Sequence, residues 1–167
     1  PYLRLLKTLD RLPEELLGTQ SLDVNTKNLQ AAEMKALSAF CAEHGDLSEL
    51  TMLCLQGNPI GDEGLAILAK ECFPRMPKLD FLALQSTHIG SAGVKALARN
   101  PPKGKLRSLY MWNNQFNGDA LDALGEAIVR GRLKVDVLVV HTNSGCSDDS
   151  RQRLKEDCAG VGCNAQV

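Results

Sequence analysis

The chain has 167 residues, of which 44% are hydrophobic and 23% are charged, as is typical of a globular domain with a packed core. This length is sufficient for one domain. A net charge of −1 gives no basic surface for nucleic acid, and no apolar run approaches the roughly 20 residues that span a bilayer. We therefore expect neither nucleic acid nor a membrane as a partner.

Residues 1–18 are predicted to form an N-terminal helical cap. Leu3, Leu6 and Leu9 recur at helical spacing, so we expect this segment to cover the open edge of the first strand. The chain opens at Pro1 without a methionine, which leaves open a lost targeting peptide or a longer parent protein.

Residues 19–145 contain an internal repeat. The stretch LTMLCLQGNPIGDEGLAILA (50–69) aligns with LDFLALQSTHIGSAGVKALA (79–98) at a constant offset of 29 residues. LRSLYMWNNQFNGDALDALG (106–125) continues the series at an offset of 27, VDVLVVHTN (135–143) adds a strand, and residues 19–37 form a degenerate first unit. About five units at nearly fixed spacing indicate a repeat architecture in which neighbours must stack to bury their apolar sides.

Each unit combines a short strand, a turn and a helix. The pattern L-x-x-L-x-L predicts strands with period-two alternation, and these strands should be parallel, near residues 21–24, 52–55, 81–84, 108–111 and 137–140. The turn often carries asparagine, as at Asn58, Asn114 and Asn143, whose amide can bond backbone groups that no ladder satisfies. In the amphipathic helix that follows, a small residue (Gly64, Gly93 or Ala120) is expected to let the helix pack close to the sheet.

The pattern L-x-x-L-x-L-x-x-N-x-I-x-x-x-G-x-x-x-L over residues 17–145 resembles the long leucine-rich repeats of the ribonuclease-inhibitor-like class. Departures are Thr87 and Lys27 at the asparagine position, Phe116 at the isoleucine position and Ala120 at the glycine position. The resemblance implies a single α/β domain: a curved leucine-rich repeat solenoid with parallel strands on the concave face and helices on the convex face.

Residues 146–167 are predicted to form a C-terminal cap. Ser147 precedes Asp148 and Asp149, an N-cap followed by two acids that favour the start of a helix. We expect this helix to close the array, because an exposed parallel edge would favour aggregation.

The residues between the strand leucines should point away from the core. In LYMWNNQF (109–116), Tyr110 and Trp112 alternate with Leu109 and Met111, so the two aromatic rings are placed on the concave surface. Aligned columns across the units predict an apolar and aromatic partner-binding patch, made of Met52, Phe81, Gln85, Tyr110, Trp112, Val137, Val139 and His141. The alternatives are that a stray helix or a longer parent protein covers this surface, or that it is ordinary exposed apolar area without a role.

Catalytic and metal chemistry find little support in the sequence. His44, His88 and His141 lie in different units, and only His141 follows a strand near a cysteine, Cys146. The cysteines at 146, 158 and 163 lack the C-x-x-C pairs of structural zinc. We expect no enzyme activity, no metal and no cofactor.

The six cysteines are interpreted as reduced thiols of an intracellular, cytoplasmic protein, with organelle import left open. A disulfide between Cys158 and Cys163, or between Cys146 and Cys158, is the alternative for the C-terminal cysteines.

The predicted function is non-enzymatic protein recognition through the concave face by a domain that is monomeric in isolation. Ribonuclease inhibitors and activators of the small GTPase Ran have similar repeats, so regulation of an enzyme or small GTPase is an alternative. A ribonuclease inhibitor would be expected to have a strongly acidic concave face, and here that face is mixed to apolar. A permanent accessory subunit of a larger complex is the third interpretation.

Overall fold

The computed structural model describes residues 2–167. The strands are β1 (Ser21–Asp23), β2 (Met52–Cys54), β3 (Phe81–Ala83), β4 (Leu106–Tyr110), β5 (Val135–Val139) and β6 (Asn164–Gln166). The helices are α1 (Leu3–Leu9), α2 (Pro13–Gly18), α3 (Ala31–His44), α4 (Gly61–Ile67), α5 (Ser91–Arg99), α6 (Gly118–Val129) and α7 (Asp148–Gly160). A π-helical turn (Leu68–Cys72) and a 3-10 turn (Phe73–Arg75) continue α4.

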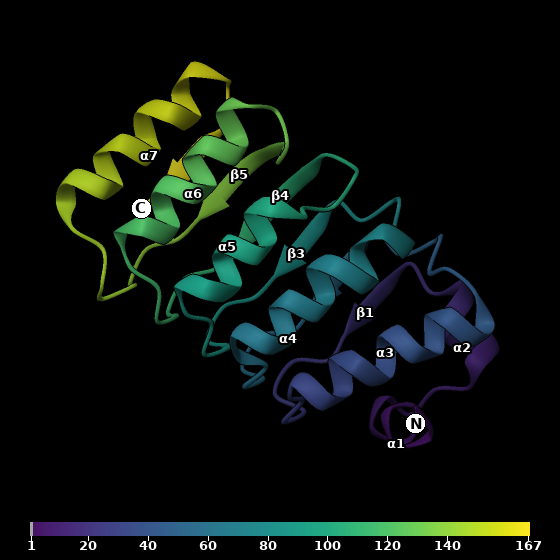
Figure 1. The fold of residues 1–167 in the computed structure, drawn as a ribbon. Coiled ribbons are helices and arrows are strands. Elements are labelled where there is room, and N and C mark those ends of the chain that lie inside the picture. Colours follow the sequence, from purple (N-terminus) through teal and green to yellow (C-terminus); the bar gives the residue numbers. More distant parts are fainter. Residues whose placement is uncertain (1) are drawn as a thin grey trace.

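The strands form one sheet in the order β1-β2-β3-β4-β5-β6, and every neighbouring pair is parallel. Figure 1 shows the helices from α3 to α7 side by side in a second layer over the sheet. Each strand is thus followed by a helix and then by the next strand in line. The predicted parallel arrangement is confirmed, although β4 and β5 each begin two residues earlier than predicted.

The core lies between the two layers and repeats from unit to unit. One row of buried residues comes from the strand centres, at Leu22, Leu53, Leu82, Leu109 and Leu138, and a second row follows two residues later, at Val24, Leu55, Leu84, Met111 and Val140. Because side chains in a strand alternate between faces, both rows point to the same side of the sheet. Burying a leucine of this size is worth about 2 kcal/mol, so the core grows with every stacked unit.

The sixth strand was not predicted. Residues 164–166 pair with β5 in the register Val137↔Asn164, Leu138↔Ala165 and Val139↔Gln166, so the C-terminal segment is a helix followed by a strand, and not a capping helix alone. Asn-Ala-Gln has neither leucines nor β-branched residues, which is why its pattern does not predict a strand. Pairing with β5 imposes the extended conformation.

The turn asparagines bond backbone groups as predicted, and they also bridge neighbouring units, which was not predicted. Asn114 is buried; its Oδ1 accepts hydrogen bonds from the backbone nitrogens of Thr87 and Ile89, each at 3.0 Å. Its Nδ2 donates to the carbonyl oxygens of Leu84 at 2.7 Å and Met111 at 3.1 Å. One amide therefore satisfies four backbone groups, of which three belong to the preceding unit.

Asn58 repeats this pattern with residues 24–29, and Asn143 donates to the Met111 and Val140 carbonyl oxygens. Thr87 stands where asparagine is expected; its hydroxyl lies 2.6 Å from the carbonyl oxygen of Leu84 and 3.2 Å from Oδ1 of Asn114 in the following unit, and it makes no bond to the preceding unit. The junction between the second and third units therefore has no asparagine bridge.

Gly64 and Gly93 face the preceding helix, which corrects the expectation that they allow close approach to the sheet. A Cβ added at Gly64 would lie 3.4 Å from Met34 and 3.5 Å from Ala31, both in α3. A Cβ added at Gly93 would lie 2.6 Å from Oδ1 of Asp62, in α4. These glycines permit close contact between helices of adjacent units.

Asp62 explains why α4 and α5 approach so closely. Its Oδ1 accepts hydrogen bonds from the backbone nitrogens of Gly90 and Gly93, each at 2.7 Å, and therefore caps α5 from the neighbouring unit. One unit later, the hydroxyl of Ser91 accepts from the backbone nitrogen of Asn117 at 3.0 Å. The N-terminal caps of α5 and α6 are thus supplied by the unit before.

The N-terminal segment consists of two short helices. Asp10 adopts a left-handed conformation (φ 53°) that ends α1, and Pro13 occupies the first position of α2, where its missing N–H costs nothing. The α1 helix packs against α3, and the Tyr2 ring lies edge-on to Phe40 at 5.5 Å between centroids. The α1 part of this cap therefore contacts the helix layer.

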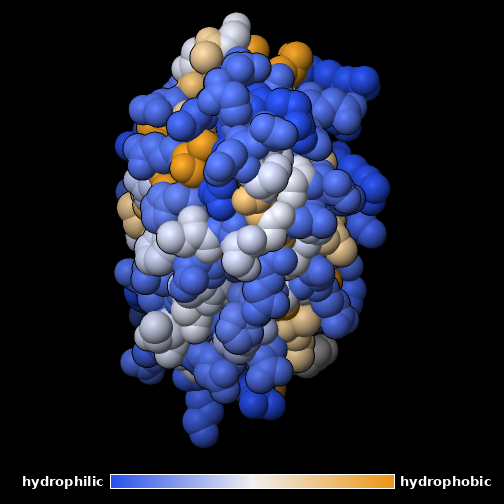
Figure 2. Space-filling model, turned by 90° about the vertical axis from the view of Figure 1, so that its left-hand side faces the viewer, coloured by the Kyte–Doolittle hydropathy of each residue, from blue (hydrophilic) through white to orange (hydrophobic). Residues whose placement is uncertain are grey.

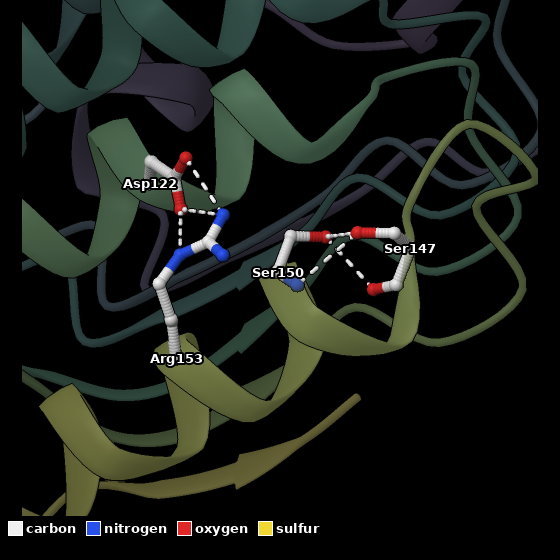
Figure 3. Close-up of polar contacts among 4 residues, drawn as sticks. All are labelled: Asp122, Ser147, Ser150 and Arg153. Atoms are coloured by element: carbon white, nitrogen blue, oxygen red, sulfur yellow. Dashed lines mark hydrogen bonds and ion pairs between the residues drawn. The ribbon is translucent and has the colours of Figure 1, made fainter.

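At the other end, α7 packs against α6. Ser147 is the predicted N-cap: its hydroxyl oxygen accepts a hydrogen bond from the backbone nitrogen of Ser150 at 3.2 Å. Arg153 reaches Asp122 of α6 with two nitrogens, each 3.1 Å from a carboxylate oxygen (Figure 3). Figure 2 shows the side of the molecule at which α7 lies in Figure 1, and this side is mostly hydrophilic, as expected for a terminal unit.

Candidate functional site

The candidate site is the side of the sheet opposite the helix layer. Leu109 and Met111 are fully buried beneath the helices, whereas Tyr110 and Trp112, which alternate with them, are partly exposed. The predicted alternation in this segment is confirmed. We call the outward-pointing residues of this side the strand face. Tyr110 is the last residue of β4 and lies near the middle of the strand face, and Trp112 follows two residues after the strand.

The sheet register aligns the strand face into columns. One column comprises Ser21, Met52, Phe81, Ser108, Val137 and Asn164; the next comprises Asp23, Cys54, Ala83, Tyr110, Val139 and Gln166. From β1 to β5 these are the columns predicted from the repeat. Asn164 and Gln166 extend them, and a further 27-residue step from Val137 and Val139 would have found both.

Two aromatic pairs occupy this face. The Phe81 and Tyr110 rings meet edge to face, with centroids 5.4 Å apart and an interplanar angle of 73°. The Trp112 and His141 rings are stacked, with centroids 5.7 Å apart and an interplanar angle of 16°. Both arrangements are favourable for aromatic side chains and hold the rings in fixed orientations. The aromatic surface is therefore pre-organised.

The predicted site residues differ in how much surface they offer. Six of the eight predicted residues are partly exposed: Met52, Phe81, Tyr110, Trp112, Val137 and His141. Val139 and Gln85 are only 5% and 8% exposed. These two residues form the floor between the larger side chains and contribute little contact area themselves.

Gln85 has one unused polar atom. Its Nε2 donates to Oε1 of Gln56 at 3.0 Å, while its own Oε1 is buried and has no hydrogen-bond partner. An unsatisfied buried acceptor is costly, so a donor that reached this oxygen would gain more than an average hydrogen bond.

The strand face is uncharged between β2 and β6. Its columns there contain no Asp, Glu, Lys or Arg, whereas the charged residues lie along the edge where the strands begin. At that edge Arg107 forms two hydrogen bonds with the Asp80 carboxylate, at 2.7 and 3.0 Å, and Lys105 pairs with Asp136. Charge therefore borders the apolar surface and does not cross it.

The other candidate chemical groups do not converge. Within residues 2–167 no group of three His, Cys, Asp or Glu side chains is arranged to hold a metal ion. All six cysteines are free thiols, and burial raises the pKa of Cys41 to about 11 and that of Cys72 to about 12, which makes both poor nucleophiles. No helix in this part of the chain is long and apolar enough to cross a membrane.

Comparison with known proteins identifies the repeat. A search of curated proteins found no match. The family model described as Leucine Rich repeat matches residues 50–69 and 75–98, two of the units defined above by their strands β2 and β3 and the helices that adjoin them. Proteins built from such repeats are typically non-enzymatic modules that bind other proteins. Residues 50–69 and 75–98 therefore match leucine-rich repeats.

Proposed function

We propose that this domain binds another protein through its strand face, without catalysing a reaction, and that Tyr110 and Trp112 are the central contacts. The observation that carries the proposal is the uncharged aromatic surface formed by the Phe81–Tyr110 and Trp112–His141 pairs. Aromatic residues are enriched among those that dominate binding energy, and exposed apolar patches mark contact sites. In a curved ribonuclease-inhibitor-like solenoid this surface would be the concave face.

The chemistry of the face defines the kind of partner. A segment that lies across β3 to β5 would meet rings, aliphatic groups and amides with no charge to pair. We therefore infer that the partner presents a neutral segment with apolar or aromatic side chains. Charged groups at the borders of that segment would face Asp80, Arg107 and Asp136.

The same surface weighs against an electrostatic inhibitor. A ribonuclease is basic, and recognition of it would draw on a strongly acidic face, whereas the columns from β2 to β6 carry no carboxylate. Recognition of a protein as a transient adaptor or as a permanent subunit would use the same residues, and the two differ in the lifetime of the complex.

The test is capture from lysate followed by affinity measurement on the purified partner. We expect Tyr110→Ala and Trp112→Ala each to weaken the captured complex at least tenfold, because each substitution removes an ordered ring at the centre of the contact. Isothermal titration calorimetry with the wild-type and variant domains measures this change.

The matched control is Val129→Ala. Val129 is 53% exposed on α6, in the helix layer, so its truncation removes apolar surface away from the strand face. Circular dichroism of all three variants checks that they fold. Unchanged affinity for Val129→Ala with a loss for Tyr110→Ala supports the proposal; equal affinities for all the variants, or a loss confined to Val129→Ala, overturn it.

A further inference from the structure

The C-terminal end of α7 brings two cysteines together. The backbone nitrogen of Cys163 donates to the carbonyl oxygen of Cys158 at 2.9 Å, and the nitrogen of Gly162 donates to that of Ala159 at 3.3 Å. Gly162 has a φ of +77°, the left-handed conformation that ends many helices. This pair of bonds is the Schellman motif, in which the residue three before the cap and the residue after the turn pack against each other. In this chain both of those residues are cysteines.

The two thiols lie in the core beneath α7 and β6. Cys158 is fully buried and Cys163 is 6% exposed. The hydrogen bond from the Cys158 thiol lowers the pKa of Cys163, and a backbone hydrogen bond from Leu138 acts in the same direction. The same thiol–thiol contact, together with burial, raises the pKa of Cys158. The pair is therefore asymmetric: Cys163 is the more exposed thiol and the one more readily ionised.

Neither the fold nor the strand face requires this pairing. A Schellman motif needs only an apolar contact at these two positions, which leucine or valine would supply. The backbone hydrogen bond between the two residues holds their side chains on the same side of the turn. We propose that Cys158 and Cys163 form an oxidation site, in which a peroxide converts the two thiols into an intramolecular disulfide that ties the end of α7 to the start of β6.

The reaction proceeds in two balanced steps. The Cys163 thiolate attacks one oxygen of hydrogen peroxide; the O–O bond breaks, a sulfenic acid forms on Cys163, and the departing oxygen leaves as water after it takes a proton. Cys158 sulfur then attacks the sulfenic sulfur, the S–O bond breaks, and a second water leaves with the Cys158 proton. The two thiols lose two electrons in total, and the peroxide is reduced to two waters.

The disulfide would act on the last strand of the sheet. β6 has three residues and is held by its pairing with β5, through bonds such as that from the Val140 nitrogen to the Gln166 carbonyl oxygen at 2.8 Å. The Cys163 side of the crosslink directly precedes this strand, so oxidation would restrict the opening of β6 away from β5. The last strand carries Asn164 and Gln166 of the strand face, and Gln166 pairs with Val139.

The experiment treats the folded, reduced domain with hydrogen peroxide, then blocks the remaining thiols with iodoacetamide and maps the peptides by mass spectrometry. We expect the C-terminal peptide that follows Lys155 to carry both cysteines as an internal disulfide, lighter than the reduced form by two hydrogen atoms (about 2 Da), which dithiothreitol restores. Cys146→Ser is the matched control, because it removes the neighbouring half-buried cysteine and should leave the disulfide intact.

Single variants test the order of the steps. In Cys158→Ser, dimedone should trap a sulfenic acid at Cys163, whereas in Cys163→Ser, Cys158 should stay unlabelled at the same peroxide concentration. Circular dichroism confirms that each variant is folded. A disulfide that joins other cysteines, over-oxidation of Cys163 in the wild type without a disulfide, or alkylation of both thiols after peroxide treatment would overturn the proposal.

Discussion

Replacement of Asn114 by alanine is expected to lower the free energy of unfolding by about 4 kcal/mol. The substitution leaves the backbone nitrogens of Thr87 and Ile89 without the acceptor that they have in the folded chain, whereas the carbonyl oxygen of Leu84 loses one donor and keeps the Thr87 hydroxyl. Each buried polar group that loses its partner costs about 1–3 kcal/mol, and here the two nitrogens lie in one turn that water enters poorly. Urea denaturation followed by circular dichroism measures the change.

Gln115→Ala is the control for this prediction. Gln115 is the next residue in the same turn, is exposed, and contributes only its backbone nitrogen, which donates to the Ile89 carbonyl oxygen at 2.7 Å. We expect its truncation to change the stability by less than about 0.5 kcal/mol. Similar losses for Asn114→Ala and Gln115→Ala would mean that the amide bridge contributes little to cohesion between units.

Gly93→Ala is expected to destabilise the domain by about 2 kcal/mol, although alanine is the better helix former. The new Cβ would lie 2.6 Å from Oδ1 and 3.0 Å from Cα of Asp62, and so would displace the carboxylate that caps α5. Thermal and urea unfolding of this variant give the magnitude.

A double-mutant cycle identifies the cause. The array itself contains the compatible combination, because the next unit has Ser91 and Ala120 at the positions of Asp62 and Gly93. In an Asp62→Ser background, Gly93→Ala should cost at least about 1 kcal/mol less than it does alone. Strictly additive effects would show that contact with Asp62 is not the source of the penalty.

The sequence pattern alone predicts the parallel sheet and its register residue by residue. This is because the leucines of each unit must reach one shared core, and a slip of one residue would turn them outward. The pairs Met52↔Phe81 and Phe81↔Ser108 follow directly from the alignment of the units. The asparagine turns are predictable for a related reason: a tight turn at the end of a strand leaves backbone groups that only a side chain can satisfy.

The features that were not predicted depend on neighbours in space. Residues 164–166 become a strand because β5 offers an edge, and Gly93 is required because Asp62 lies in the preceding helix. Neither fact is visible in the segment concerned. The exposure of Tyr110 and Trp112 could be predicted, because alternation along the chain decides which side of the sheet a side chain faces. The burial of Gln85 and Val139 could not, because it depends on the larger side chains beside them.

The caps that pass from one unit to the next also limit how such an array can change by recombination. If residues 79–105 were deleted, β2 and α4 would be followed directly by the unit that begins at Leu106, and Asp62 would face Ala120 in place of Gly93. Equal length and a shared leucine pattern would not make that junction compatible. Loss or duplication of a unit therefore calls for a second change at the new boundary, which favours inheritance of adjacent units as blocks.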